Sequence, residues 1–330
     1  MNDISANANR GTALAAGADP ATKPAAGTAR RGLGKRILRS YELYLFLLPT
    51  LVYFAVFHYV PIYGVQIAFK NFVAVKGIAG SAWVGFDHFE RFFHSDRFWT
   101  VIRNTLGISL YELLVAFPAP IVLALLVNQV GNGRFRRFVQ TITYAPHFIS
   151  TVVIVGMLYL FLSPRSGLVN QAIVAFGGEP VFFMASTGWF KTIFVFSGVW
   201  QNVGWATIIY LAALSSISPD LHEAAVMDGA TKLQRVRHID LPGIMPTIVI
   251  LLILNMGHLL SVGFEKVYLM QNQLNIDSSE IIQTYVYKAG LLNGQFSYSA
   301  AIGLFNSVVN FALLVAVNQA ARRMKQQSLW

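Results

Sequence analysis

Six stretches of this chain are each long enough to cross a membrane as an α-helix, and each contains at most one charged side chain. A charge at the bilayer centre costs at least a few kcal/mol, so gaps between charges mark candidate membrane spans. Each gap is 24 to 33 residues long, whereas an α-helix needs about 20 residues to cross the hydrocarbon core. The gaps lie between Glu42 and Lys70, Arg103 and Arg134, Arg137 and Arg165, Lys191 and Asp220, Asp240 and Glu265, and Lys288 and Arg322.

Composition supports the same interpretation, because 55% of the residues are hydrophobic and only 12% are charged, against about 25% charged in soluble domains. We therefore predict an all-α integral membrane protein. A shorter apolar run at 166–178 is expected to lie on the membrane or pack on the bundle. The six predicted transmembrane helices are at about 43–64, 104–128, 138–162, 192–214, 246–268 and 299–319.

The distribution of basic residues predicts the orientation. Of the 25 Lys and Arg residues, 16 fall on one predicted face, which places both termini in the cytoplasm. Residues 1–38 are predicted to be a disordered cytoplasmic tail, 39–321 one domain of six transmembrane helices, and 322–330 a cytoplasmic tail. The net charge of +10 therefore requires no nucleic acid, since no aromatic cluster interleaves with the basic residues.

Motifs for catalysis and metal binding are absent from the sequence. It contains no cysteine, no H-E-x-x-H, no G-x-S-x-G and no phosphate-binding loop of the G-x-x-x-x-G-K-[ST] type. His88 and His94 are the closest outer-loop histidines, and we assign them to loop packing. No catalytic residue, bound cofactor or metal is expected in this chain.

The second predicted span carries Pro118 and Pro120 near its middle. Each proline removes a backbone donor and opposes the carbonyl four residues earlier, so the helix should kink or break there. Two interpretations are open: a static kink and a hinge used in transport. The same gap contains Glu112, for which pairing with a basic group and exposure to water are both considered.

The loop at about 215–245, between the fourth and fifth spans, has the pattern of two short helices. Ser218 or Asp220 can cap the first helix, and Gly229 can end it in a left-handed conformation. The stretch 232–239 resumes a helical rhythm before Pro242 leads the chain into the membrane. An amphipathic helix pair lying at the membrane surface is the alternative interpretation.

This loop resembles the EAA loop of ABC importer permeases. The match consists of Glu223-Ala224-Ala225, Asp228-Gly229-Ala230, Ile239, Leu241-Pro242 and Pro246. The resemblance implies the type I permease fold, with the first loop helix docking on a separate ATPase subunit that binds ATP and Mg. The residues it assigns to ATPase coupling are Glu223, Ala224, Ala225, Asp228, Gly229 and Ala230.

Further segments between about residue 41 and the carboxyl end are similar to a subgroup of sugar permeases. They include 83–89, 136–150, 167–170, 294–298 and 328–330. This subgroup imports polysaccharide-derived oligosaccharides, alginate and other uronides among them. The resemblance implies a bacterial inner-membrane subunit that pairs with a second permease, two ATPases and an extracytoplasmic solute-binding protein.

Polar and aromatic side chains inside the spans are candidates for the sugar path, because polar groups facing lipid would be costly. Interhelical hydrogen bonding is the alternative role. Two alternative functions are an ion-coupled secondary carrier and an intramembrane hydrolase or transferase. The first requires paired carboxylates and inverted repeats, whereas only Glu112 is well inside a span, and the second requires catalytic motifs that the sequence lacks. The path candidates are Gln201, Asn202 and Trp205 in the fourth span, and Asn255, His258, Ser261 and Glu265, predicted along one side of the fifth.

Overall fold

The computed structural model describes residues 41–323, and this range is almost entirely helical. Its strands are the two-residue β1 (Lys70–Asn71) and β2 (Ala82–Trp83), which pair antiparallel with Lys70 opposite Trp83. The predicted all-α class is confirmed. The predicted tail at 1–38, and residues 324–330 of the one at 322–330, lie outside the described residues.

The chain divides into two units, Met1–Ile62 and Tyr63–Trp330. The described part of the first unit comprises α2 (Tyr41–Phe54), a π turn (Ala55–Tyr59) and α3 (Val60–Ile62). All of its side chains are exposed, including Phe46 at 83%. A helix that is apolar on every side is typical of a membrane span.

The second unit holds the remaining elements. Short 3-10 turns (Tyr63–Phe69, Ala74–Lys76, Ala145–Phe148 and Phe183–Ala185) and π turns (Val236–Asp240 and Lys288–Leu292) connect its helices. The helices are α4 (Gly77–Gly80), α5 (Asp87–Phe93), α6 (Phe98–Val115), α7 (Pro118–Asn128), α8 (Gly133–Tyr144), α9 (Thr151–Phe161), α10 (Leu168–Ala175), α11 (Phe190–Ser215), α12 (Pro219–Met227), α13 (Lys232–Arg235), α14 (Leu241–Met256), α15 (Phe264–Met270), α16 (Ile276–Ser279), α17 (Ile282–Tyr287) and α18 (Phe296–Arg323).

Among the described residues, five helical runs are long and apolar enough to cross a membrane, and a bent helix pair supplies a sixth candidate. The bent pair corrects the prediction of a single helix at about 138–162, because the chain bends by 99° between Gly133–Phe148 and Thr151–Phe161. Pro146 is buried at this break, and the Ser150 hydroxyl caps α9 by accepting from the Val153 amide at 3.4 Å. The five runs are Tyr41–Phe69, Phe98–Asn128, Phe190–Ser215, Lys232–Met256 and Phe296–Arg323.

The fifth span also differs from its prediction at 246–268. Its helix starts at Lys232 and stops at Met256, and residues 257–263 are unwound. Asn310 of α18 accepts from the Leu260 amide at 2.9 Å, and the Gln283 side chain donates to the Leu260 carbonyl. Non-helical backbone at membrane depth requires such partners, because lipid offers none.

The predicted break at the prolines of the second span is confirmed. α6 ends at Val115 and α7 begins at Pro118. The Glu112 carbonyl accepts from both the Ala116 amide at 2.7 Å and the Phe117 amide at 3.3 Å. The Glu112 carbonyl therefore closes the last turn of α6 just before the break between α6 and α7.

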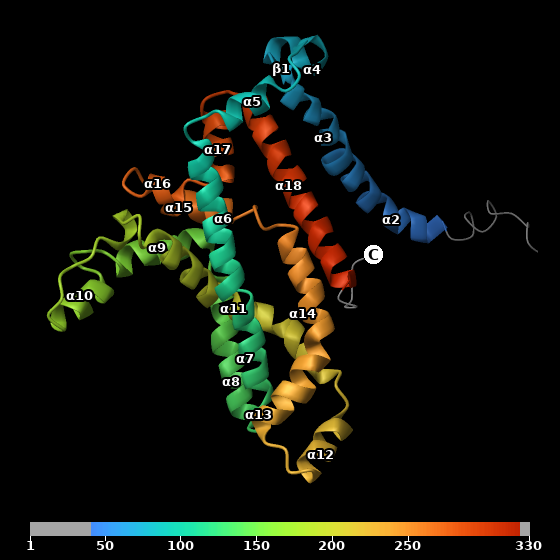
Figure 1. The fold of residues 1–330 in the computed structure, drawn as a ribbon, viewed down its shortest axis with the longest axis vertical. Helices are drawn as coiled ribbons and strands as arrows, with labels where there is room; N and C mark the ends of the chain where they lie inside the picture. Colours follow the sequence, from blue (N-terminus) through green and yellow to red (C-terminus); the bar gives the residue numbers. More distant parts are fainter. Residues whose placement is uncertain (1–40, 324–330) are drawn as a thin grey trace, which may run out of the picture. The chain divides into compact units, whose positions relative to one another are not determined.

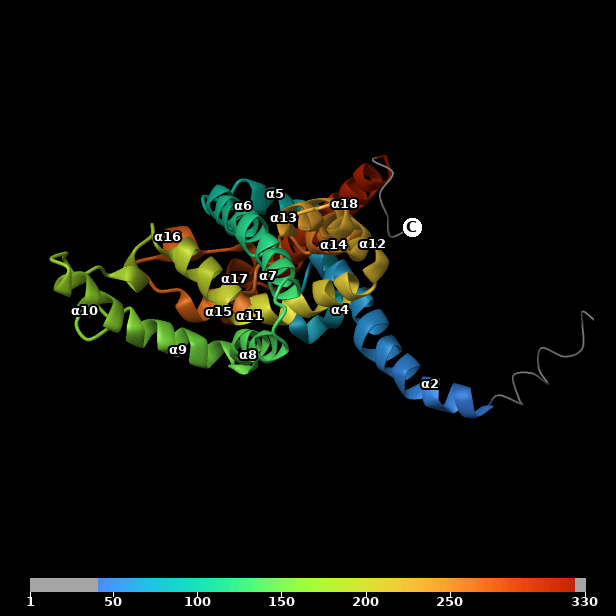
Figure 2. The same ribbon diagram turned by 90° about the horizontal axis from the view of Figure 1, so that it is seen from below.

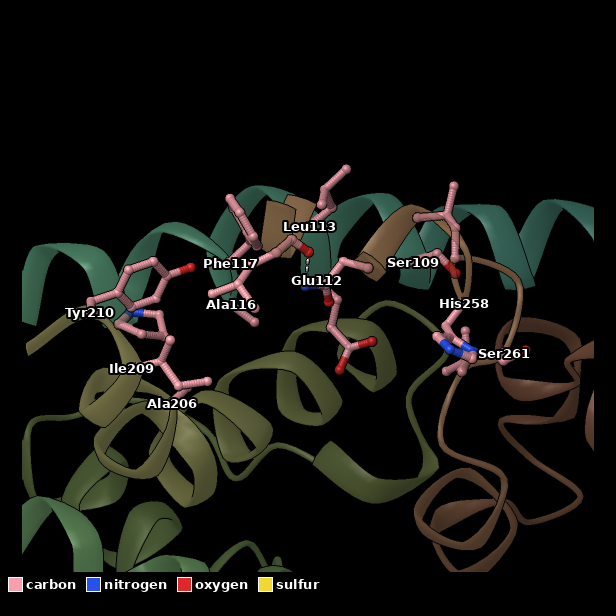
Figure 3. A pocket seen from close by; sticks show the side chains of 15 residues that line it. Ser109, Glu112, Leu113, Ala116, Phe117, Ala206, Ile209, Tyr210, His258 and Ser261 are labelled. Carbon is pink, nitrogen blue, oxygen red and sulfur yellow. Dashed lines mark hydrogen bonds between the residues drawn. The ribbon is translucent and has the colours of Figure 1, made fainter. Parts of the chain in front are cut away.

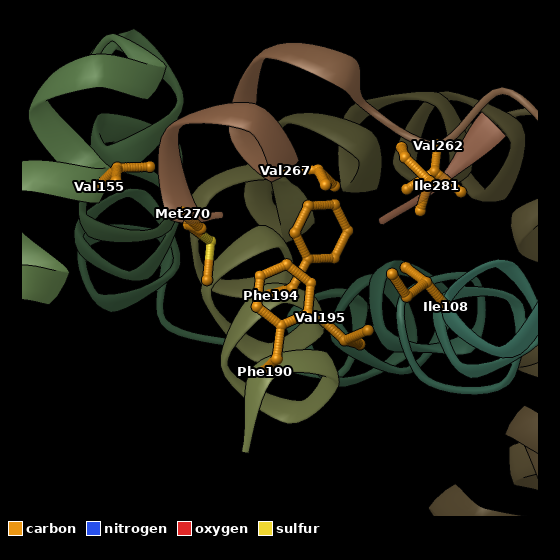
Figure 4. Packing of buried hydrophobic residues seen from close by; sticks show 9 residues of the cluster. All are labelled: Ile108, Val155, Phe190, Phe194, Val195, Val262, Val267, Met270 and Ile281. Carbon is orange, nitrogen blue, oxygen red and sulfur yellow. The ribbon is translucent and has the colours of Figure 1, made fainter. Parts of the chain in front are cut away.

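α11 packs against α6, α7, α8 and α14 in the centre of the second unit. One buried cluster joins it to α6, α9 and α15 through residues such as Phe194, Ile108 and Val267 (Figure 4). α12 lies at the lower end of this unit and α5 with β1 at the upper end (Figure 1). α9 and α10 extend to one side, away from α14 and α18, in both views (Figures 1 and 2).

Candidate functional site

The loop predicted to contact the ATPase contains the short helix α12. Ser218 caps it, with its hydroxyl accepting from the Asp220 amide at 3.3 Å, and Pro219 occupies the first turn where a missing amide proton costs nothing. No residue of α12 is buried, and Met227 is 86% exposed. The helix therefore presents an apolar and acidic surface at one end of the unit (Figure 1).

The six predicted coupling residues form the end of α12 and the turn that follows it. Gly229 has φ 77°, as predicted for a left-handed cap. The Ala230 amide donates to the Ala225 carbonyl at 2.8 Å, and the Gly229 amide to the Val226 carbonyl at 3.0 Å. These two bonds are those of a Schellman motif, which explains physically why a glycine stands at this distance after the alanines.

The second part of the loop contains a cap that sequence reasoning missed. Thr231 and Gln234 form a capping box that starts α13, and the spacing of these two residues was the available signal. The helical run then continues without interruption from Lys232 to Met256. Pro242 therefore lies within a continuous helix instead of restarting the chain, which corrects the prediction.

A cavity of about 360 Å³ lies among α6, α7, α11 and the unwound end of the fifth span. Figure 3 shows Ser109 and Glu112 directed toward it from α6, with Tyr210 on one side and His258 and Ser261 on the other. Asn255 also lines the cavity. Three of the four path candidates of the fifth span thus share one space, although only Asn255 is in α14, so the prediction of a continuous helix side is wrong.

Glu265, Gln201 and Asn202 line a second cavity, of about 300 Å³. Glu265 belongs to the separate helix α15, because the unwound segment interrupts the predicted helix before it. Glu112 lines both cavities and so lies between the two groups of candidates. The first cavity is lined mostly by apolar residues and the second more evenly, and the polar side chains in each suit the hydroxyl groups of a sugar.

Gln201 and Asn202 also hold the bent third span. The Gln201 amide donates to the Ile149 carbonyl at 3.0 Å, and Asn202 Oδ1 lies 3.0 Å from His147 Nδ1. Trp205 stacks on His147 with ring centroids 4.6 Å apart, and it is not among the residues lining the two cavities. The structure therefore places Trp205 at the bend, away from both spaces where the other path candidates lie.

Sequence reasoning did not identify Lys266 as part of this site. Its side chain is 8% exposed, and Nζ donates to the Phe194 carbonyl at 2.8 Å and lies 4.8 Å from the Phe194 ring centre. A Cβ at Gly198 would be 3.3 Å from Lys266 Nζ and 4.0 Å from Glu112 Oε1. Both charged groups thus approach Gly198 of α11, and Lys266 is a basic group near enough to act on the charge of Glu112.

Within residues 41–323 no cluster of three or more His, Asp or Glu side chains is arranged to hold a metal ion. The polar groups described above are suited to hydrogen bonding and to ion pairing.

Comparison with known proteins gives a consistent result. Residues 116–326 match the family model described as "Binding-protein-dependent transport system inner membrane component". The polygalacturonan/rhamnogalacturonan transport system permease protein YteP of Bacillus subtilis is 44% identical over 91% of this chain and 94% of its own length. Protein LplB of the same organism is 43% identical over 92% of this chain and 96% of its own.

Solved structures agree with these relatives. A chain of a bacterial ABC transporter involved in the import of the acidic polysaccharide alginate superposes with a TM-score of 0.84 at 41% identity, covering 90% of this chain and 100% of that one. A second structure, in complex with an alginate pentasaccharide-bound periplasmic protein, has the same TM-score at 40% identity, covering 91% of this chain and 100% of that one.

Proposed function

The chain belongs to the family of binding-protein-dependent transport system inner membrane components and is a non-catalytic, multi-pass permease subunit of a sugar ABC importer, and from this premise we propose that it imports acidic oligosaccharides released from a polysaccharide. Its relatives include a polygalacturonan/rhamnogalacturonan permease and an alginate importer, and both kinds of polymer are rich in carboxylates.

The observation that carries the ATP-driven part of this proposal is the exposed helix α12 with its Schellman end. Its apolar side chains Leu221, Val226 and Met227 are 53% to 86% exposed on a helix that has no buried residue. Such a surface suits a groove on another protein. We assign that groove to an ATPase subunit, where ATP and Mg would bind, with Glu223 offering a charge to a basic group.

The complete transporter would contain four kinds of component in the bacterial inner membrane: this chain, a second permease, a pair of ATPases and an extracytoplasmic solute-binding protein. Both termini of this chain would be cytoplasmic, on the side of α12, by the distribution of basic residues. The sugar would pass the two cavities lined by Asn255, His258, Ser261, Gln201, Asn202 and Glu265. Family membership argues against the ion-coupled carrier considered from the sequence.

The test is reconstitution of the four components in liposomes with short polygalacturonate and alginate oligosaccharides as test sugars. We expect the sugar-loaded binding protein to stimulate ATP hydrolysis and uptake of at least one of the two. Neutral xylo-oligosaccharides of equal length serve as the matched control. Stimulation by the neutral sugars alone would contradict the acidic substrate, and uptake driven by an ion gradient without ATP would contradict the ABC mechanism for this subunit.

A further inference from the structure

Asp240 is a fully buried carboxylate at the base of the coupling loop, with an exposed fraction of 0%. The Gln129 side chain donates to Asp240 Oδ2 at 2.9 Å. His222 Nε2 lies 3.3 Å from Oδ1, which has no hydrogen bond of good geometry among the described residues. Arg235 is the other basic group close enough to act on the Asp240 charge.

These contacts join both ends of the loop between α12 and α14 to the end of α7, which lies 111 residues before Asp240. His222 is in α12, Gln129 is the residue that ends α7, and Asp240 directly precedes α14. α7 leads back to the break at Pro118, and α14 leads to Asn255, so both helices continue to the first cavity. Asp240 therefore lies where the coupling helix meets two helices that line the sugar path.

The surroundings of Asp240 are closely packed. Ala124 and Val127 of α7, Leu214 of α11 and Ile244 of α14 belong to one buried cluster at this level. Ile217 packs closely against Gly243, since a Cβ added to Gly243 would lie 2.5 Å from Ile217 Cδ1. Packed interiors transmit displacement because they deform little.

α12 itself has no buried residue, so few contacts hold it to this packed base. Removing one partner of a buried charge is strongly unfavourable. The contact between His222 and Asp240 is therefore hard to replace by water. Motion of α12 alone would leave the Asp240 carboxylate with Gln129 as its remaining side-chain hydrogen-bond partner.

We propose that Asp240 is a positioning residue for energy coupling: through His222 on one side and Gln129 on the other, it makes α12 and the end of α7 move together. This inference rests on the proposed function of α12 as the helix that docks on the ATPase. Displacement of α12 by the ATPase then moves the break between α6 and α7, and with it the wall of the first cavity.

The test reads the cavity directly. The chain contains no cysteine, so Asn255→Cys places a single thiol in this subunit at the cavity, and its labelling rate by a small maleimide is measured in the assembled transporter with and without a non-hydrolysable ATP analogue. We expect Asp240→Asn and His222→Leu to reduce the nucleotide-dependent change in rate by about fivefold or more, the size of a typical coupling between sites. The double variant should lose no more than either single one.

His238→Leu is the matched control, because this exposed histidine of the same loop makes its hydrogen bond within its own helical run, with Nδ1 2.9 Å from the Gln234 carbonyl oxygen. It should keep the full nucleotide effect, and His222→Arg should restore most of it by supplying a cation. Co-purification of the ATPase subunits and basal ATP hydrolysis should be retained in all variants.

Three outcomes would overturn this inference. The first is an unchanged nucleotide effect in Asp240→Asn and His222→Leu, and the second is an equal loss in His238→Leu. The third is loss of ATPase co-purification, which would assign these residues to docking. If the Asn255→Cys subunit without any change at His222 or Asp240 shows no nucleotide effect and no ATPase binding, the proposed function fails together with the inference. If this subunit shows the nucleotide effect and Asp240→Asn and His222→Leu keep it, the inference alone is refuted.

Discussion

At the scale of single residues, Lys266 carries a positive charge into a buried position between helices. Its ammonium group depends on the Phe194 carbonyl and on the opposite charge of Glu112. We predict that Lys266→Met lowers the stability of the purified subunit by about 1–3 kcal/mol, because the Glu112 carboxylate then loses the nearby opposite charge that offsets its burial. Thermal unfolding in detergent measures the change.

Glu112→Gln provides the reciprocal variant, and the double variant Glu112→Gln/Lys266→Met removes both charges. The double variant should be more stable than the sum of the two single effects implies, since neither charge is then left alone. Strict additivity would show that the two side chains do not depend on each other.

Asn255 is the path candidate for which the structure supports the clearest test. Its side-chain NH₂ donates to the Leu251 carbonyl at 2.8 Å, and it lines the first cavity. We predict that Asn255→Leu raises the half-saturating sugar concentration for uptake about fivefold, the value of one lost hydrogen bond, while assembly is retained. Leu254→Ala, one residue away and not among the residues lining the cavity, should leave uptake kinetics unchanged; equal effects of both would assign Asn255 to helix packing.

At the scale of elements, the end of α12 depends on the left-handed conformation of Gly229. A Cβ at this position would meet no atom within 4 Å, so a substitution acts through the backbone alone. Valine in this conformation costs roughly 1–2 kcal/mol, whereas asparagine adopts it more readily. We predict that Gly229→Val unwinds the Schellman turn, weakens co-purification of the ATPase and abolishes uptake, and that Gly229→Asn retains both.

Immunoblots of membranes should show normal amounts of either Gly229 variant, because the turn lies outside the apolar core. Normal uptake by a Gly229→Val complex would refute the assignment of α12 as the coupling element. Equal loss in the asparagine variant would indicate that the surface of the turn, and not its backbone, is recognised.

At the scale of the whole molecule, two loops that are distant in sequence form one surface at the end of the second unit opposite α12. The Phe72 amide donates to Ser297 Oγ at 2.9 Å, and Arg91 donates to the Gln295 side chain at 2.9 Å and covers the Tyr298 ring at 4.4 Å. A buried cluster that includes Phe92 lies beneath. The two loops, 70–103 and 270–298, thus form a single surface, which we propose as the contact with the solute-binding protein.

We predict that a cysteine at Val75, which is 97% exposed, crosslinks to the binding protein, and that a cysteine at Met227, which is 86% exposed, crosslinks to the ATPase. In spheroplasts, a membrane-impermeant maleimide should label Val75→Cys and spare Met227→Cys. The cysteine-free chain supplies an unlabelled background. The reverse labelling pattern would invert the proposed topology.

The sequence by itself determined the membrane class, the approximate position of most spans and the left-handed turn that ends α12 at Gly229. Spans follow from the length of a charge-free segment against the thickness of a bilayer, which needs no knowledge of packing. The ends of α12 follow from Ser218 and Gly229, whose effects act on backbone groups within one helical turn. Helix ends of this kind are determined by residues that are close to each other in the sequence.

Tertiary structure alone decided how the site is assembled. The bend of the third span is held by Gln201, which lies 52 residues from its partner, and the unwound segment of the fifth span by Asn310, 50 residues from Leu260. The contact of Asp240 with Gln129 spans 111 residues. No periodicity or capping rule specifies such pairs, because a polar group in a membrane can be satisfied by any partner that packing brings within reach.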